Sequence, residues 1–104
     1  MGIDRAQNRD EHWMSEALKL AEKGALQGEV PVGAIVVLHG EIIGRGWNQP
    51  IASCDPSAHA EVMALRDAAL SQRNYRLPDA ELFVTVQHRV NGNFSVTKPR
   101  RARP

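Results

Sequence analysis

The sequence predicts an α/β fold, and two kinds of pattern carry this prediction. Residues 10–23 repeat apolar side chains at helical spacing, and residues 58–70 follow the kind of signal that opens a helix. Residues 34–38 and 82–86 are short runs rich in β-branched side chains, which favour strands. With a further strand at 41–48 the order becomes α-β-β-α-β, and such mixing of helices and strands is typical of the α/β class.

The first helix is expected over residues 10–23. Asp10 and Glu11 favour its start, and Gly24 is a plausible stop. Its apolar residues lie three and four positions apart, which places them on one face: Trp13, Ala17, Leu20 and Ala21. This stripe predicts that the helix packs on a sheet.

The next segment reads as a β-hairpin. Residues 30–33 lead into the buried run 34–38, and His39-Gly40 forms a tight turn into 41–48. Trp47 lies at the end of the second strand, where a tryptophan more often packs in a core than stacks on a nucleotide. Stacking on a base would contribute ~1–3 kcal/mol.

The second helix is expected over residues 58–70. Asp55 or Ser57 could cap its start, because a side-chain oxygen there accepts hydrogen bonds from free backbone N–H groups. Pro56 suits the first positions of a helix. Leu77-Pro78 then breaks the chain before the third strand, whose apolar residues are expected to lack cover.

Composition fits one small domain without a membrane segment. The chain has 104 residues, of which 42% are hydrophobic and 24% charged. No apolar run approaches the ~20 residues that cross a bilayer, and residues 1–7 lack the layout of a signal peptide. The single cysteine excludes an intramolecular disulfide framework and agrees with a reducing compartment. We therefore expect a cytoplasmic protein with no membrane contact.

Charge divides the chain at residue 86. Residues 1–86 hold eight Lys and Arg against twelve Asp and Glu, whereas 87–104 hold five basic residues and no acid. Such a tail could bind nucleic acid, but an unstructured, solvated end is the simpler interpretation. Asn91-Gly92 could alternatively close a short hairpin. We expect an N-terminal tail at 1–9, a partial domain at 10–86 and a divergent basic tail at 87–104.

His59 and Glu61 form a His-x-Glu motif, which has the most chemical content in the chain. Residues two apart do not share a helix face, so both can reach one group only where a helix begins. In zinc-dependent nucleobase deaminases this motif precedes Pro-Cys-x-x-Cys; histidine and cysteines hold Zn²⁺, and the glutamate moves protons. Zinc lowers the pKa of bound water toward ~7. Taken alone, however, a His-x-Glu pair is usually an ordinary helix surface.

Other segments of the sequence make this motif a more specific signal. Four segments occur in an order and spacing that resemble the N-terminal two thirds of the bacterial tRNA-specific adenosine deaminases: 29–34, 46–48, 55–61 and 74–77. The resemblance covers about residues 10–86. It implies a three-layer α/β/α sandwich of the cytidine deaminase-like superfamily, C-terminally truncated here, a homodimer, and zinc-dependent hydrolysis of adenosine to inosine at the tRNA wobble position.

The resemblance also implies roles for single residues. His59 matches the zinc-binding histidine and Glu61 the catalytic proton shuttle. Asn48 matches an asparagine beside the target base, and Val30 lies in a segment that lines the base pocket. The expected partner is the tRNA anticodon loop, and the expected cofactor is zinc.

The departure from the family begins after Val86. Where the family continues Glu-Pro-Cys-x-x-Cys, Arg89 and Gly92 occupy the two cysteine positions. Arginine stays protonated and cannot bind zinc, and glycine has no side chain. The possible substitutes are few, and each is more simply a solvated or packed side chain: His88, Cys54, His12 and His39. A catalytic zinc needs three protein ligands and a water, so the sequence predicts an incomplete site.

Three functions are therefore open. The first is a tRNA adenosine deaminase-like protein that is impaired in this form. The second is a non-catalytic RNA-binding fragment that uses the basic tail, and the third is another zinc deaminase, acting on cytosine or guanine nucleotides. Residues 74–76 and the local spacings argue for the tRNA enzyme over the third.

Overall fold

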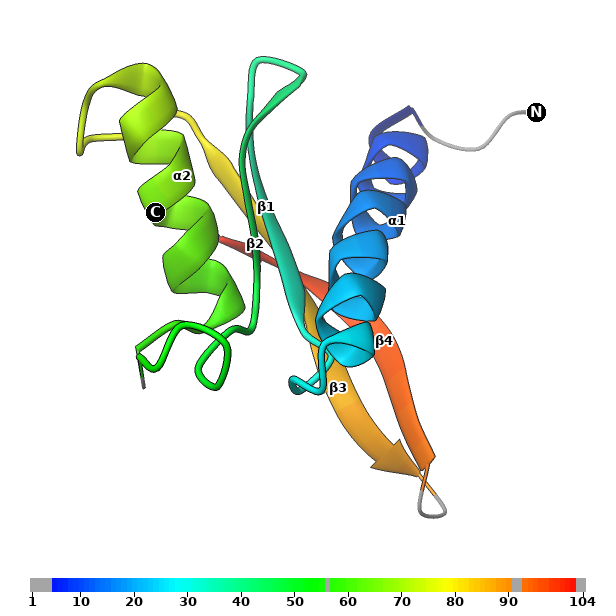
Figure 1. The fold of residues 1–104 in the computed structure, drawn as a ribbon. Coiled ribbons are helices and arrows are strands. Elements are labelled where there is room, and N and C mark those ends of the chain that lie inside the picture. The colour runs from blue at the N-terminus through cyan, green and yellow to red at the C-terminus, as the bar shows by residue number, and fades with distance from the viewer. Residues whose placement is uncertain (1–4, 56, 91–92, 103–104) are drawn as a thin grey trace.

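The computed structural model describes residues 5–55, 57–90 and 93–102, and side chains within 9–55 and 57–85. It has three layers, with a helix on each side of one sheet (Figure 1), as the α/β/α prediction requires. The described elements, in chain order, are α1 (Arg5–Leu26), β1 (Gly33–Leu38), β2 (Glu41–Trp47), α2 (Ala60–Gln72), β3 (Glu81–Val90) and β4 (Asn93–Ala102).

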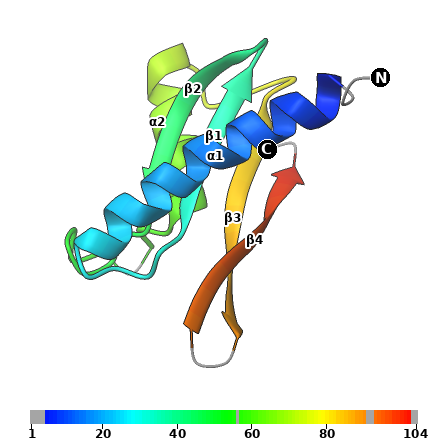
Figure 2. The same ribbon diagram turned by 90° about the vertical axis from the view of Figure 1, so that its right-hand side faces the viewer.

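The sheet has the strand order β2-β1-β3-β4, and every neighbouring pair is antiparallel. β1 pairs with β2 through a two-residue turn in which His39 (φ 50°) and Gly40 (φ 79°) both adopt left-handed backbone. This conformation matches the twist of the two flanking strands. The predicted hairpin is confirmed, and β1 occupies the centre of the fold (Figure 2).

α1 covers one face of the sheet. Ala17 and Ala21 are buried at its inner side, as the predicted apolar stripe requires. On this face the sheet contributes a compact group of buried residues: Ile35, Val37 and Phe83. The half-buried side chains of Trp13 and Leu20 pack against that group. The first core therefore lies between α1, β1 and β3.

α2 covers the opposite face and approaches β2 very closely. Its inner stripe consists of Ala60, Ala64 and Ala68, all fully buried. A Cβ atom at Gly44 or Gly46 of β2 would collide with the backbone of this helix. Small residues on both surfaces thus let helix and strand pack backbone against backbone.

The C-terminal region differs from the expectation of an unstructured tail. β3 continues to Val90 and pairs with β4 along its length, from Leu82↔Ala102 to Val90↔Asn93. The alternative prediction, a hairpin in this region, agrees with the pairing of β3 and β4. β3 pairs with β1 only over Glu81–Val84, so β3 and β4 continue past the start of β1 as a two-stranded arm (Figure 2).

The expectation that the third strand lacks cover was wrong for two residues. Phe83 is 1% exposed because α1 and β1 enclose it, and Val84 is 5% exposed on the α2 side. Leu82 is half-buried, and the side chain of Val86 lies outside the described residues. Within the described part of the chain, neither helix combines the length and apolar character that a membrane span requires.

Candidate active site at the start of the second helix

His59 and Glu61 lie where α2 begins. His59 is the residue before the helix, with extended backbone (φ −82°, ψ 153°) and an exposed side chain. Glu61 belongs to the first turn and is half-buried. The prediction that both residues stand at a helix start is confirmed, and this is the position from which they can address one group.

Asn48 holds this helix start in place. Its side chain is 8% exposed, and its Oδ1 accepts a hydrogen bond from the Ala60 backbone N–H at 2.8 Å. His59 itself makes no side-chain cap. The structure therefore brings Asn48, His59 and Glu61 together, whereas the sequence predicted Asp55 or Ser57 as the cap of α2.

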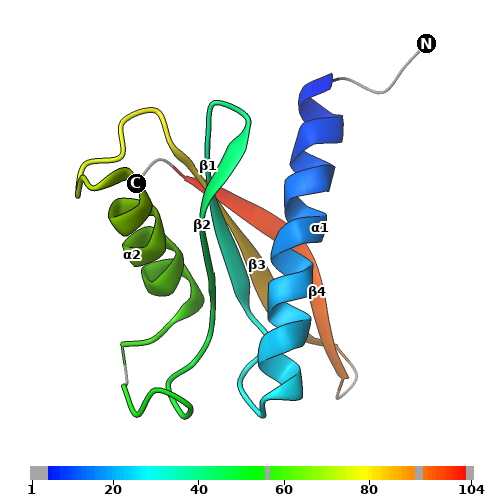
Figure 3. The same ribbon diagram turned by 45° about the horizontal axis from the view of Figure 1, so that its top comes forward.

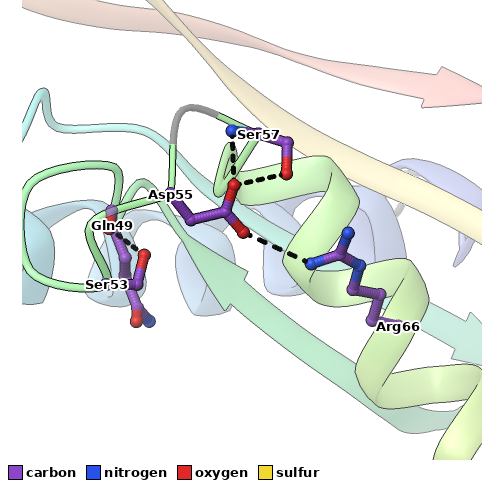
Figure 4. Close-up of polar contacts among 5 residues, drawn as sticks. All are labelled: Gln49, Ser53, Asp55, Ser57 and Arg66. Carbon is purple, nitrogen blue, oxygen red and sulfur yellow. Dashed lines mark hydrogen bonds and ion pairs between the residues drawn. The ribbon is translucent and has the colours of Figure 1, made fainter.

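That expected cap was wrong because Asp55 is used in a local turn. One carboxylate oxygen of Asp55 accepts hydrogen bonds from the Ser57 backbone N–H (2.9 Å) and hydroxyl (2.7 Å) (Figure 4). Its other oxygen lies 3.8 Å from an Arg66 guanidinium nitrogen. The Ser57 hydrogen bonds, with a smaller contribution from the Arg66 charge, hold the pKa of Asp55 below its usual value of 3.8.

The same loop contains a second local hydrogen bond, earlier in the chain than Asp55. The Ser53 hydroxyl donates a hydrogen bond to the Gln49 carbonyl oxygen (Figure 4). Gln49 in turn donates its backbone N–H to the Ala58 carbonyl at 2.8 Å. Ala58 thus lies beside Gln49, so the chain is back at the end of β2 before α2 begins.

Glu29 is a structural residue of the site whose role was not predicted from the sequence. It is 6% exposed, and its carboxylate accepts hydrogen bonds from the backbone N–H groups of Ile51 (3.2 Å) and Ala52 (2.8 Å). It thereby ties the segment before β1 to the loop before α2. Its neighbour Val30 is 54% exposed at this junction. The only sequence signal was an acidic residue directly before the Val-Pro-Val-Gly entry to β1.

Trp47 packs against the end of α1. Its indole N–H donates to the Gln27 side-chain carbonyl at 3.1 Å, and the Lys23 ammonium lies 4.2 Å from the ring centroid. These contacts favour the packing interpretation of this tryptophan over base stacking.

The described residues do not form a zinc site. Among them, no three His, Cys, Asp or Glu side chains are grouped so as to hold a metal ion. Cys54 is exposed, and its thiol is 3.9 Å from the Ile51 carbonyl oxygen. His39 lies in the β1–β2 turn and His12 on the first half of α1, at the opposite end of the sheet from the start of α2 (Figure 1). His59 therefore has no grouped partners for a metal ion within the described ranges.

His88, the remaining substitute, lies in β3 opposite Ser95 of β4. Its side chain is outside the described residues. The backbone is nevertheless informative, because β3 runs through Arg89 to Val90 as a paired strand. In the deaminase family that the sequence resembles, a helix carrying two cysteines begins at this point, so this chain differs from the family here.

Comparisons with known proteins point to a family of deaminases. The family model of the cytidine and deoxycytidylate deaminase zinc-binding region matches residues 7–87. A tRNA-specific adenosine deaminase of Buchnera aphidicola (subspecies Schizaphis graminum) is 51% identical over 80 residues, covering 77% of this chain and 53% of that protein. The chain spans about half the length of the curated relatives it matches.

Two solved structures share the fold. One comes from a study of A-to-I editing by tRNA:A34 deaminases at the wobble position of transfer RNA (TM-score 0.70, 40% identity, covering 72% of this chain and 58% of that one). The other is guanine deaminase from Bacillus subtilis (TM-score 0.69, 39% identity, covering 72% and 48%). Deaminases with different substrates therefore share this fold, so the fold alone does not identify a substrate.

Proposed function

Because this chain belongs to the cytidine and deoxycytidylate deaminase zinc-binding family, we propose that it carries one half of a tRNA adenosine deaminase site. The complete site would hydrolyse adenosine to inosine at the wobble position of tRNA. The chain as it stands is proposed to be impaired, because it contributes one zinc ligand, His59, where a catalytic zinc needs three.

The observation that carries this proposal is the buried Asn48–Ala60 hydrogen bond at the start of α2. It holds the His-x-Glu motif at a helix start, which is the arrangement that the deaminase signature needs. The 51% identity to a tRNA-specific adenosine deaminase extends across this region. This identity supports adenosine in tRNA as the substrate, whereas the two solved structures, at 40% and 39% identity, do not separate adenosine from guanine.

We assign the following roles to the chain's own residues. His59 is proposed as the zinc ligand of the complete site, and Glu61 as the carboxylate that takes and delivers protons. Asn48 is proposed to lie beside the target base, with its Oδ1 already engaged by the Ala60 N–H. Val30 is proposed as part of the wall of the base pocket, which suits its exposed apolar side chain.

The proposed substrate is the anticodon loop of tRNA, and the proposed location of the reaction is the cytoplasm. By family resemblance we also propose that the complete protein is a homodimer. The basic residues of 87–104 would add affinity for RNA through release of counterions from phosphates, an effect that weakens with salt.

A chimera tests the proposal directly. Residues 1–86 of this chain are joined to the part of the Buchnera deaminase that follows its match, and inosine formation is measured on tRNA, with free guanine and cytidine as alternative substrates. We expect inosine in tRNA and loss of activity in the Glu61→Gln chimera. A zinc-loaded, folded chimera that deaminates only guanine or cytidine would overturn the substrate assignment.

A further inference from the structure

A pocket lies at the end of the sheet opposite His59 and Glu61. The start of α1, the β1–β2 turn and the chain just before β3 are at that end, whereas α2 begins at the other end (Figure 3). These segments enclose a volume of about 390 Å³. Pockets that hold small molecules usually measure roughly 300–1,000 Å³. The pocket is therefore large enough for a small ligand and is separate from the site at the start of α2.

The wall of the pocket comes from α1 and from the sheet beneath it. Asp10 and Trp13 are three residues apart on α1, so they lie on one side of the helix. Val37 of β1 pairs with Glu81 of β3, and residues directly opposite in a sheet share a face. Val37 belongs to the core under α1, so Glu81 lies on the α1 side as well. Two carboxylates, an aromatic ring and an apolar side chain thus line one hollow.

Two turns complete the pocket, through His39 and Asp79. Asp79 follows Pro78 in a turn that the Ala80 N–H closes on the Leu77 carbonyl oxygen at 3.3 Å. Its left-handed backbone (φ 64°) is the conformation that favours glycine after a proline in such a turn. Asp79 is exposed, and within the described ranges its carboxylate has no hydrogen-bond or ion-pair partner. A third carboxylate therefore lines the pocket on its solvent side.

The charges of the lining favour a cation. Three carboxylates, those of Asp10, Asp79 and Glu81, accompany the guanidinium of Arg9, so the lining is negative overall. Arg9 is exposed, whereas Asp10 and Glu81 are half-buried, and solvent therefore screens the arginine more strongly. A concave surface with charge of one sign concentrates ligands of the opposite sign. The same lining disfavours anions.

The arrangement of these groups favours an organic cation over a metal ion. In the part of the chain that the structure describes, no three His, Cys, Asp or Glu side chains are grouped so as to hold a metal ion. Trp13 is half-buried against the core under α1, and its remaining surface lines the pocket. An aromatic face attracts organic cations, and a guanidinium stacks on such a face while its planar fork binds carboxylates.

We propose that this pocket binds a small organic cation, and that an alkylguanidinium is the best match. The charged group would lie among the carboxylates, and its flat face or its alkyl chain would lie against Trp13. Because the pocket is at the far end of the sheet from His59 and Glu61, this binding does not depend on the proposed deaminase function. A guanidinium can come from a free small molecule or from an arginine side chain of another protein, and both present the same chemistry.

An NMR titration of the full 104-residue chain tests the site. Agmatine carries a guanidinium at one end of a short alkyl chain and an ammonium at the other, and a blocked arginine amide presents a guanidinium as a protein does. We expect saturable shifts of the Trp13 indole N–H and of the Val37 and Gly40 amides, and none with uncharged butylurea. Tighter binding of agmatine would assign a free ligand, and tighter binding of the blocked arginine would assign a protein side chain.

Charge variants locate the site and should act in opposite directions. Asp79→Asn should weaken agmatine binding about tenfold, because a charged hydrogen bond to the guanidinium is lost. Asparagine tolerates the left-handed backbone at this position, so the turn should keep its shape. Arg9→Gln should tighten binding about twofold, the size expected for one exposed charge. Glu22→Gln is the matched control, since Glu22 is exposed on the second half of α1 and should leave the affinity unchanged.

The aromatic contact has its own variant. Trp13→Leu should weaken agmatine binding about fivefold through loss of the aromatic face. Since Trp13 also packs on the core, thermal unfolding checks that this variant is folded, and Asp79→Asn tests the pocket without touching the core.

Shifts that do not saturate, or equal shifts with butylurea, would overturn this site. An affinity that Asp79→Asn and Glu22→Gln lower equally would overturn it as well, because it would show general attraction to an acidic surface. A chimera that forms no inosine would contradict the proposed function and would leave the cation site standing.

Discussion

The start of α2 and the end of β3 are the two places where the deaminase signature puts zinc ligands, and here they differ completely. At the start of α2, buried Asn48 and Glu29 hold the backbone that presents His59 and Glu61. At the end of β3, the chain carries no cysteine and runs on as a paired strand. The comparison teaches that the first half of the site is held by hydrogen bonds within the chain itself.

The largest predicted difference between the two regions concerns metal binding by this chain alone. We expect well under one zinc per chain by elemental analysis after dialysis, because His59 has no grouped partners among the described residues. Inosine formation on tRNA should be undetectable. A stoichiometric, chelator-resistant zinc would contradict this prediction and would make His88 and Cys54 the residues to substitute next.

The contact between α2 and β2 should dominate the stability of the first half. Gly46→Val should lower the free energy of unfolding by about 3 kcal/mol or more, since its side chain would enter space held by the α2 backbone. Arg45→Val is the control on the same strand: Arg45 is exposed, and its change should stay within about 0.5 kcal/mol. Denaturant unfolding of both variants measures the difference, and equal effects would contradict the close approach.

The Glu29 contacts should matter nearly as much. Glu29→Ala leaves the Ile51 and Ala52 N–H groups without their acceptor and should cost about 2 kcal/mol, while Glu29→Gln keeps one acceptor oxygen and should cost less. Amide exchange at residues 51 and 52 should accelerate in the alanine variant. Unchanged exchange would show that the Glu29 hydrogen bonds do not hold the loop before α2.

Local patterns sufficed to predict much of this molecule. The stripe on α1, the His39-Gly40 turn and the helix start at the His-x-Glu motif are all encoded by neighbours in sequence. Contacts between distant residues were missed. Glu29 meets Ile51 across 22 positions, and Asn48 caps α2 from 12 positions away, which no spacing rule reveals.

β4 was missed for a different reason. Residues 97–104 show no apolar alternation, so nothing in them indicates a strand with a buried face. Their pairing with β3 comes from the hairpin, since the two strands are separated by only the Asn91-Gly92 link. Here the Asn91-Gly92 turn signal predicts the structure of the segment better than its basic, proline-containing composition does.

A smaller effect is expected at the cap. Asn48→Ala should lower the free energy of unfolding by about 1–2 kcal/mol, the usual cost of removing a helix cap. Asn48→Asp keeps the Oδ1 acceptor for the Ala60 N–H and should retain more of the stability. Hydrogen exchange at Ala60 reports the cap itself. An alanine variant as stable as the parent would show that the helix start is held by other contacts.

The smallest expected effect is the pH dependence contributed by Asp55. Its pKa in the folded protein is lowered, first by the Ser57 hydrogen bonds and then by Arg66, relative to the usual value of 3.8. The folded state thus favours the ionised carboxylate, and the resulting stability is fully present above the unfolded pKa and lost as pH falls through the folded pKa. Because the group is exposed, solvent screens it and the change should be slight. Unfolding of the parent and of Asp55→Asn, compared at neutral pH and at acidic pH below 3.8, should converge as Asp55 is protonated. An NMR titration that returns an unshifted carboxyl would contradict the turn geometry before α2.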